Sequence, residues 1–248
     1  HPPPRYAPGV AESAVVSATA DISPSAHIAA NVTIGDRSKI GENAYVGPGT
    51  VIGPDCSVGD DCRLIANVIL VRDVILGLRS ILHPGVVIGA DGFGNAMTPE
   101  GWVKVPQLGG VRIGNDVEIG ANTTVDCGAI DDTVIEDGVR IDNLCHIGHN
   151  VRIGAHSAVA GMSGISGSAT IGKRCMLAGQ SGIVGHISIC DDVVVGGKAV
   201  ISKDITEPGV YAGTFTAEPA REWNRKVARF RRLGQLIERV NKLEKGGE

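Results

Sequence analysis

Residues 147–170 read IGHNVR IGAHSA VAGMSG ISGSAT, four consecutive blocks of six that each begin with an aliphatic residue. The spacing extends in both directions along the chain. It holds at twelve positions from Ile22 to Ile88, three from Ile113 to Val125 and twelve from Ile135 to Ile201, with an insertion at 129–132. Such regularity predicts a solenoid in which each block is a short strand plus a turn, and three blocks form a coil of about 18 residues.

The fourth residue after each aliphatic position should also point inward, where little room remains beside the aliphatic side chain. The composition agrees with a thin interior of small and β-branched residues, because the chain has 35 Gly and only 3% aromatic residues but is 43% hydrophobic. The sequence therefore predicts a parallel β-helix, although the spacing alone does not give its hand. The small inward positions that support this interpretation are Ser157, Ser163, Ala169, Cys175, Ser181 and Ala199.

The cysteines follow the same repeat. Inward thiols behave as small hydrophobic groups, so we expect no disulfide framework and a reducing compartment. No apolar run is long enough to cross a bilayer, which predicts a cytoplasmic protein without stable membrane insertion. Four cysteines take the small inward position, namely Cys56, Cys62, Cys145 and Cys175, whereas Cys127 and Cys190 are expected at turns.

Two segments depart from the repeat. The first is a loop at 90–110, and loops this long in a compact domain are usually functional. The second follows Pro219, where apolar residues recur at helical spacing and predict an amphipathic helix whose apolar stripe needs a cover. We assign 1–15 to an N-terminal linker that begins as a fragment or processed start, 16–215 to the β-helix and 216–248 to the C-terminal helix.

Charge is unevenly divided along the chain. Residues 218–248 hold nine Lys/Arg and five Asp/Glu, a net +4, so the rest carries −8 to reach the total of −4. The basic segment is either a solvated helix face or a docking surface for an acidic partner. Nucleic acid is disfavoured, because the rest of the chain is acidic and no aromatic residues alternate with the basic ones.

Candidate chemistry gathers around His149. It follows the repeat position Ile147 by two, which places it at a turn and pointing outward, where a neutral imidazole can act as a general base. One coil later, the amide of Gly167 should stack beside it and could hold an oxyanion. His186 lies about two coils from His149, roughly 10 Å along the axis. This arrangement suits acyl transfer, although exposed histidines on a structural solenoid remain an alternative.

Several motifs resemble a known family. Residues 83–94 (HPGVVIGADGFG) and 102–107 (WVKVPQ) resemble the UDP-3-O-(3-hydroxyacyl)glucosamine N-acyltransferases of lipid A biosynthesis. The match continues in the Trp223-bearing tail and at 117–126, 141–143, 146–150, 164–168, 179–180 and 182–186. The resemblance implies a left-handed β-helix and a homotrimer with active sites between subunits. It also implies transfer of a 3-hydroxyacyl group from the phosphopantetheine of acyl carrier protein to the 2-amino group of UDP-3-O-acylglucosamine, with no other cofactor and no metal.

The resemblance further assigns roles to individual residues. His149 matches the catalytic base and His186 a second active-site histidine. Acyl carrier protein is acidic, which would give the basic helix its partner. The implied substrate-binding residues are Asp142, Asn143 and His146 with Phe93 and Gln107 of the loop, and the implied carrier contacts are Arg221, Arg225, Lys226 and Arg229.

The chain also departs from the family pattern. Asn95 stands where the family usually has Phe, Cys127 where it has Arg, and the N-terminal domain that supplies much of the uridine pocket has no counterpart. A slot from His149 to Ile201 spans about three coils, roughly 14 Å, and favours an acyl chain of medium length.

Three alternative functions remain open. The first is the sister O-acyltransferase that acts on UDP-N-acetylglucosamine, against which the motif at 91–107 argues. The second is a non-catalytic structural solenoid. The third is a hexapeptide carbonic anhydrase, which would need three histidines from two subunits on one zinc ion, drawn from His83, His146, His149 and His186.

Overall fold

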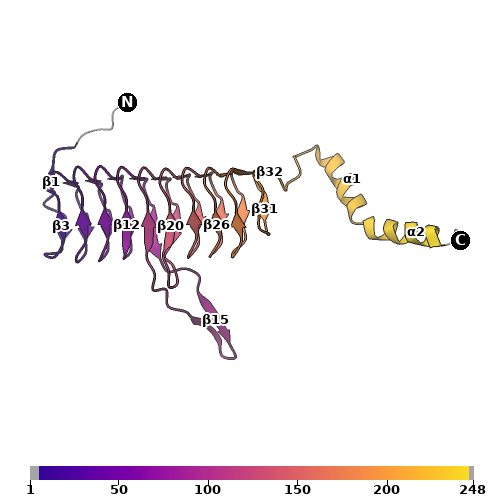
Figure 1. Ribbon diagram of the computed structural model, residues 1–248, viewed down its shortest axis with the longest axis horizontal. Helices are drawn as coiled ribbons and strands as arrows, with labels where there is room; N and C mark the ends of the chain where they lie inside the picture. Colours follow the sequence, from indigo (N-terminus) through magenta and orange to yellow (C-terminus); the bar gives the residue numbers. More distant parts are fainter. Residues whose placement is uncertain (1–5, 246–248) are drawn as a thin grey trace. The chain divides into compact units, whose positions relative to one another are not determined.

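A computed structural model describes residues 6–245, which divide into a solenoid that ends at Gly213 and a helical unit that begins at Thr214 (Figure 1). Part of the predicted N-terminal linker, residues 1–5, lies outside the described residues. The first strand already lies at Gly9–Val10, so the solenoid begins earlier than residue 16. Gly9–Val10 belongs to the solenoid because it pairs in parallel with His27–Ile28, one coil later, and so adds the first strand to one face.

Three parallel sheets form the faces of the solenoid, and the chain passes from one face to the next at each corner. Face A has 11 strands within the described residues: β1 (Gly9–Val10), β4 (His27–Ile28), β7 (Tyr45–Val46), β10 (Arg63–Leu64), β13 (Ile81–Leu82), β18 (Glu118–Ile119), β21 (Arg140–Ile141), β24 (Ala158–Val159), β27 (Met176–Leu177), β30 (Val193–Val195) and β32 (Gly209–Tyr211).

The other two faces are built in the same way from the same part of the chain. Face B has ten strands: β2 (Val15–Val16), β5 (Thr33–Ile34), β8 (Val51–Ile52), β11 (Ile69–Leu70), β14 (Val87–Ala90), β19 (Thr124–Asp126), β22 (His146–Ile147), β25 (Gly164–Ile165), β28 (Gly182–Ile183) and β31 (Val200–Ile201). Face C has nine: β3 (Asp21–Ile22), β6 (Lys39–Ile40), β9 (Ser57–Val58), β12 (Val74–Leu76), β17 (Val111–Ile113), β20 (Thr133–Ile135), β23 (Arg152–Ile153), β26 (Thr170–Ile171) and β29 (Ser188–Ile189).

The repeat positions form the core. Ile147 pairs in register with Ile165, which pairs with Ile183, and none of these side chains is more than 2% exposed. Each inward aliphatic residue therefore lies on its equivalent in the next coil. The predicted small positions are buried as well: Ser157, Ser163, Ala169, Cys175, Ser181 and Ala199. The predicted parallel β-helix is confirmed.

The corners stack through left-handed turn residues. Asn150, Ser168 and His186 occupy equivalent positions in three successive coils, with φ of 59°, 61° and 62°. This conformation is unfavourable for residues other than glycine. It persists because each turn is hydrogen-bonded to the previous coil: Ser168 N–H donates to His149 O at 2.8 Å, and His186 N–H donates to Gly167 O at 3.1 Å. The corner between faces B and C is thus held in fixed register.

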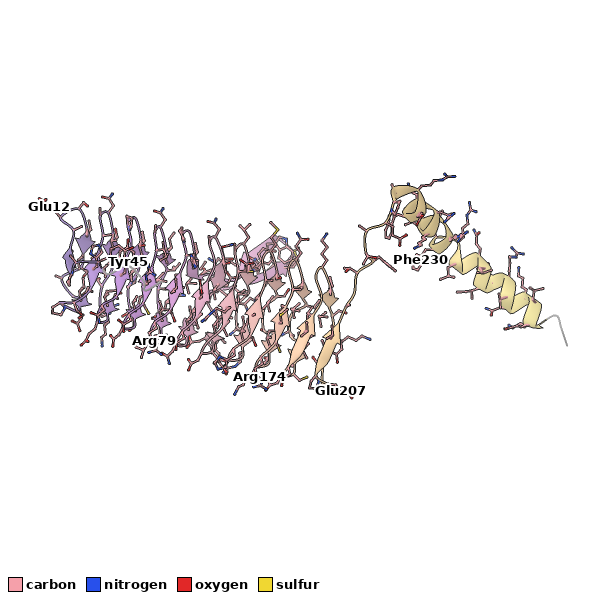
Figure 2. The ribbon with its side chains drawn as sticks, turned by 90° about the horizontal axis from the view of Figure 1, so that it is seen from above. Glu12, Tyr45, Arg79, Arg174, Glu207 and Phe230 are labelled. Atoms are coloured by element: carbon pink, nitrogen blue, oxygen red, sulfur yellow. The ribbon has the colours of Figure 1, made fainter. Side chains whose placement is uncertain are left out.

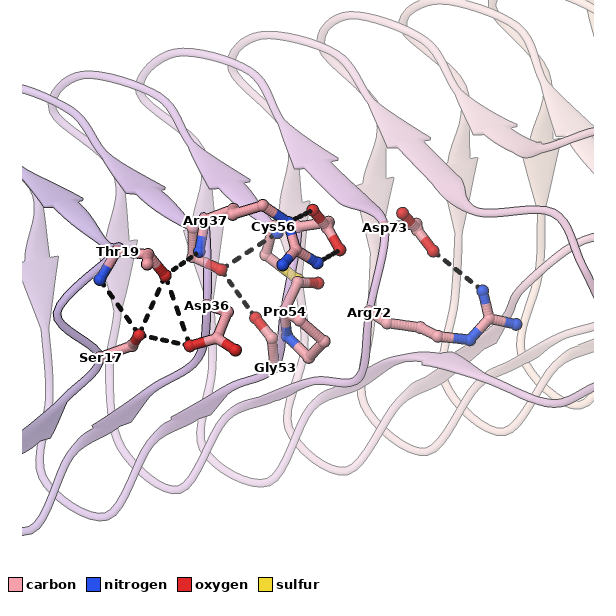
Figure 3. Close-up of polar contacts among 11 residues, drawn as sticks. Ser17, Thr19, Asp36, Arg37, Gly53, Pro54, Cys56, Arg72 and Asp73 are labelled. Atoms are coloured by element: carbon pink, nitrogen blue, oxygen red, sulfur yellow. Dashed lines mark hydrogen bonds and ion pairs between the residues drawn. The ribbon is translucent and has the colours of Figure 1, made fainter.

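Charged pairs add a second ladder along the corners. Between faces C and A, the Arg79 guanidinium makes two hydrogen bonds of 2.7 Å to Asp116, and Figure 2 shows Arg79 and Arg174 projecting from the same edge. Between faces B and C, Arg37 binds Asp55 in the same bidentate way (Figure 3). Hydrogen bonding to Arg37 lowers the pKa of Asp55. These pairs are exposed, so they align coils more than they stabilise the fold.

The loop at 90–110 is more ordered than the sequence indicated. It contains an antiparallel hairpin of β15 (Asn95–Thr98) and β16 (Gly101–Lys104), which projects from the solenoid (Figure 1). The base of the hairpin is fixed by hydrogen bonds from the Arg72 guanidinium to Gln107 O and from Gly110 N–H to Asp132 Oδ1, the latter at 2.6 Å. This anchoring positions the first residues of the loop over the corner between faces B and C.

The C-terminal helical extension is confirmed, but the prediction of one helix was wrong. Two helices are present, α1 (Ala220–Phe230) and α2 (Leu233–Lys245), separated by a turn at Arg231 and Arg232. Gly234, in the first turn of α2, is a poor helix former and favours the interruption. Neither helix has a buried residue. No helix in residues 6–245 has the length and apolarity that crossing a membrane requires.

The cysteines are all free, as predicted, but one of the two expected at turns is more buried than a turn position suggests. Cys56, Cys62, Cys145 and Cys175 are buried in the core, and burial raises the pKa of the Cys62 thiol to about 12. Cys127, expected at a turn, is fully buried. Its N–H donates to Ala90 O at 2.8 Å, so the start of the inserted loop covers it.

The stacking of inward residues gives a first prediction. Replacing Leu70, which is fully buried in β11, with alanine should destabilise the solenoid by roughly 2–5 kcal/mol, because a cavity opens between coils. The matched control is Ile69→Ala in the same strand, where the side chain is 38% exposed. Denaturant unfolding followed by circular dichroism measures both. Equal losses for the two variants would contradict the inward assignment.

Candidate active site

His149 lies at the corner between faces B and C, directly after β22, and is partly buried. Its imidazole is flanked by two glycines. A Cβ at Gly92 of the loop would come within 2.7 Å of His149 Cβ, and a Cβ at Gly167 within 2.7 Å of His149 Cε1. The ring therefore fits between Gly92 and Gly167 only because neither residue has a side chain. The structure brings Gly167 to His149, as the repeat predicted.

Asn150 fixes the protonation pattern of His149. Asn150 Nδ2 donates to Asp131 O at 2.8 Å, so its Oδ1 must be the acceptor for the neighbouring groups. That oxygen lies 2.9 Å from His149 Nδ1 and also accepts from Ala129 N–H at 2.9 Å. His149 Nδ1 consequently carries the hydrogen, and the lone pair of a neutral ring is on Nε2, beside Gly167. Nε2 is then free to accept a proton from a substrate.

The backbone N–H of Gly167 is available as a donor. Within residues 6–245 no backbone hydrogen bond uses it, whereas Gly167 O accepts from His186 N–H at 3.1 Å. A base and an unpaired N–H thus lie side by side. This pair can activate a nucleophile and stabilise the negative oxygen of a tetrahedral intermediate.

His186 is brought to the same corner as His149, and its side chain is exposed. It occupies the turn position equivalent to Ser168, two coils beyond Asn150. The predicted trio of His149, Gly167 and His186 is therefore arranged along one edge of the solenoid.

A cleft of about 530 Å³ lies between the inserted loop and face B. His146 Nδ1 lies 2.9 Å from Thr124 Oγ1, and His146 Nε2 lies 3.7 Å from Asp126 Oδ2. Lys104 pairs with Asp91 across the start of the loop. Burial raises the pKa of Asp126. The residues that line the cleft are Asp91, Gly92, Phe93, Gly94, Asn95, Lys104, Asp126 and His146.

The two loop residues expected to bind substrate have different surroundings. Phe93 lines the cleft and is 87% exposed. Gln107 is only 4% exposed and packs behind Gly92 and Gly94 instead of lining the cleft. Its Nε2 donates to Val105 O at 3.2 Å, while its Oε1 is buried without a hydrogen bond. Gln107 therefore shapes the loop beside His149.

Asp142 and Asn143 lie at a different corner from His149, between faces A and B. They line a separate groove of about 720 Å³ on face A, together with His83, Glu118 and Met176. Asp142 accepts hydrogen bonds from Asn143 N–H at 2.7 Å and from Gly161 N–H at 3.0 Å. One chain therefore does not bring Asp142 and Asn143 together with His149.

The histidines do not converge as zinc ligands within the chain. His83 Nε2 pairs with Glu118 Oε1 at 2.8 Å on face A, whereas His146 and His149 belong to face B and its corner. Across the described part of the chain, no three His, Cys, Asp or Glu side chains are grouped so as to hold a metal ion.

The four predicted carrier-binding residues all lie on α1 with exposed side chains. Lys226 Nζ forms an ion pair with Glu218 Oε1 at 2.6 Å, so it is partly neutralised within the helical unit. The helix presents them as a basic surface, formed by Arg221, Arg225, Lys226 and Arg229.

Several residues of the site were missed by sequence reasoning. Asp126 and Asn150 stood inside quoted motifs without a role, and the pairing of Lys104 with Asp91 was not anticipated. The signal for Asn150 was its place directly after the candidate base. For Asp126 the signal was its place directly after the inward-facing residue Val125. A carboxyl group at such a position points outward and is expected to be solvated.

The chain is similar in sequence to known hexapeptide-repeat proteins. The model of the bacterial transferase hexapeptide (six repeats) matches residues 37–68 and 132–167, and the hexapeptide repeat of succinyl-transferase matches 168–203. UDP-3-O-acylglucosamine N-acyltransferases are similar to this chain in sequence. They include those of Hahella chejuensis (49% identity over 172 residues), Coxiella burnetii (54% over 171) and an Acidovorax species (57% over 164).

These alignments cover 69%, 68% and 66% of this chain and 49%, 50% and 50% of the relatives, so the chain spans about half the length of the curated relatives it matches. They confirm the resemblance to the N-acyltransferases.

Solved structures support the fold. A UDP-N-acetylglucosamine O-acyltransferase from Moraxella catarrhalis superposes with a TM-score of 0.62 at 22% identity, covering 88% of this chain and 77% of that one. A UDP-N-acetylglucosamine acyltransferase from Arabidopsis gives 0.55 at 23% identity, with 82% and 71% covered. At this identity the likeness concerns the fold alone, and it confirms the left-handed β-helix.

Proposed function

We propose that this chain catalyses N-acyl transfer in lipid A biosynthesis, moving a 3-hydroxyacyl group from acyl carrier protein to the 2-amino group of UDP-3-O-acylglucosamine. The observation that carries the proposal is the His149 imidazole, held between Gly92 and Gly167 with its Nδ1 bonded to Asn150. The names of the relatives at 49–57% identity supply the reaction. The reaction takes place in the cytoplasm, in keeping with six free cysteines.

The chemistry follows from the two groups at the corner. His149 Nε2 removes a proton from the amine as its nitrogen attacks the thioester carbonyl. Gly167 N–H stabilises the resulting oxyanion. Collapse of the intermediate expels the thiolate of the phosphopantetheine arm, which takes the proton back from the His149 imidazolium. The acyl donor arrives on the carrier protein, so the proposal requires no cofactor or metal held by this chain.

We further propose a homotrimer with each site shared between two chains. The support is the separation of the predicted substrate-binding residues. Asp142 and Asn143 line the groove on face A, whereas His149 lies at the corner between faces B and C. A neighbouring chain that placed its groove against this corner would unite them.

The sister O-acyltransferase is the second candidate, and the motif at 91–107 argues against it. One assay separates the two functions. The protein is incubated with 3-hydroxyacyl carrier protein and either UDP-3-O-acylglucosamine or UDP-N-acetylglucosamine, and products are identified by mass spectrometry. The N-acyltransferase proposal requires an amide product from the first acceptor. Product from the second acceptor alone would establish the sister activity, and product from neither would reject both.

The basic surface of α1 gives a prediction about the carrier. Reversing two charges that lack an ion pair in the helical unit, Arg225→Glu with Arg229→Glu, should raise the KM for the acidic carrier at least tenfold at low salt, because electrostatic attraction is lost. The kcat at saturating carrier should change little. The control is Arg239→Glu on α2, with the same change of charge per site. An equal effect of the control, or none from the double variant, would contradict docking on α1.

A further inference from the structure

Asp126 is a buried carboxyl group without a hydrogen-bond partner. Its side chain is 11% exposed, and within residues 6–245 no hydrogen bond reaches its oxygens. The one ionic contact, to His146 Nε2, is 3.7 Å long and too long for a hydrogen bond. Buried carboxylates are normally paired or hydrogen-bonded, because desolvation is otherwise costly. An unpaired acceptor of this kind in the wall of a cleft is available to a ligand that supplies the donor.

The position of Asp126 relates it to the base. Val125 pairs in register with Ile147, so Asp126 lies beside the residue that precedes His149. Ala90 pairs with Asp126 on the other side, which brings the start of the loop over it. Asp126 lines the cleft together with Gly92, and Gly92 packs against His149. The cleft that Asp126 lines therefore reaches the base.

Within the described chain, Asp91 and Asp126 are the two carboxyl groups that line the cleft, and only Asp91 is paired with a lysine, Lys104. His146 is bonded through Nδ1 to Thr124 and contacts Asp126 only at long range. The Asp126 side chain is only 11% exposed, so its carboxyl group has little contact with solvent. A poorly solvated carboxylate binds a cationic donor more strongly than a neutral one.

We propose that Asp126 binds the amino group of the acceptor sugar and selects an amine over a hydroxyl at that position. This inference rests on the proposed function and names the residue that recognises the nucleophile. The carboxylate accepts a hydrogen bond from the amino group and holds its nitrogen near His149. The carboxylate selects the ammonium form, which first loses one proton to water. The neutral amine then attacks the thioester carbonyl and forms the C–N bond, His149 removes a second proton, and the C–S bond breaks as the thiolate takes that proton. Asp126 stays ionised throughout.

The test measures binding separately from turnover. Titration calorimetry compares UDP-3-O-acylglucosamine with its analogue bearing a 2-hydroxyl group, on the wild-type protein and on Asp126→Asn. The wild type should bind the amino ligand roughly 10- to 100-fold more tightly, as expected for a charge-assisted hydrogen bond. Asp126→Asn, which keeps the shape of the side chain, should bind both ligands with similar affinity. Its kcat/KM for the amino acceptor should fall while the hydroxyl ligand binds as before.

Two controls make the outcomes distinct. Thermal unfolding at pH 7 should show Asp126→Asn to be at least as stable as wild type, because removing a buried ionised carboxyl relieves a desolvation cost. His149→Ala should keep the preference for the amino ligand while losing turnover. A wild type that shows no preference, or an Asp126→Asn variant that retains it, overturns the inference. Preserved discrimination without acyl transfer would instead reject the proposed function and leave the amine site standing.

Discussion

His149→Ala should lower kcat by roughly 10²- to 10⁴-fold, the contribution expected of a general base. The variant lacks the Nε2 that accepts the amine proton. His146 is not positioned to replace it, because it is bonded to Thr124 through Nδ1 and lies on face B. Binding of the acceptor should change little, because the groups of the cleft are retained. The measurement is the steady-state rate of amide formation at saturating acyl carrier protein and acceptor.

The matched control is His156→Ala. His156 is also a histidine at a corner of the solenoid, but it lies between faces C and A. Unlike His149 it is exposed and has a left-handed backbone, with φ of 61°. Its loss should leave kcat within about twofold, as expected for a surface substitution away from the site. If His149→Ala retained near wild-type kcat, the assignment of the base would be wrong and only the solenoid would remain.

Gly167→Ala should give the second large loss of activity. The variant keeps both catalytic groups but displaces the His149 ring. The added Cβ would overlap His149 Nε2 and lie 2.8 Å from its Cδ2, so the ring would have to move. The backbone N–H is preserved, and Gly167 does not have a positive φ, so neither the oxyanion donor nor the fold is removed. Misplacement of the base by about 1 Å should cost roughly 10²-fold in kcat.

The control for this substitution is Gly196→Ala, whose Cβ would meet its nearest neighbour, Tyr211 O, at an ordinary 3.4 Å. Both variants should unfold at nearly the wild-type temperature, and only Gly167→Ala should lose activity. A Gly167→Ala variant with wild-type kcat would show that the position of the imidazole is not critical. Loss of activity together with a large fall in melting temperature would refute the assumption that the fold tolerates a Cβ there.

The parts of the fold that depend on periodicity could be predicted from the sequence. Inward residues such as Ile147 and Ile165 are fixed by a six-residue period, and the coil period places Gly167 beside His149. Period alone could not describe the segment 90–110, since a hairpin depends on pairing between its own strands. The same segment covers Cys127, which is why this residue is buried although it lies, as expected, in the connection between two strands. The break between α1 and α2 reflects the low helix propensity of Gly234. The apolar spacing continues across this break and therefore predicts a single helix.

The site itself was only partly predictable. His149 could be found because an outward histidine on a repeat is conspicuous, whereas the role of Asp126 depends on burial by the inserted loop. The insertion at 129–132 also shifts the spacing between β19 and β22, so that counting along the chain does not place Asp126 near His149. The separation of Asp142 from His149 follows from the corners that each occupies, which becomes visible once strands are assigned to faces.

The stacking of coils has a consequence for how the site responds to fluctuations. Each coil contacts only the coils directly before and after it, so opening at either end of the solenoid breaks one interface at a time. Within residues 6–245, the outermost strands of face B, β2 and β31, have one neighbour each, whereas β19, β22 and β25 around His149 are paired on both sides. Fraying that begins at an end must unzip several interfaces in turn before it disturbs the catalytic corner. Thermal fraying at the ends should therefore have little effect on the position of His149 and Gly167.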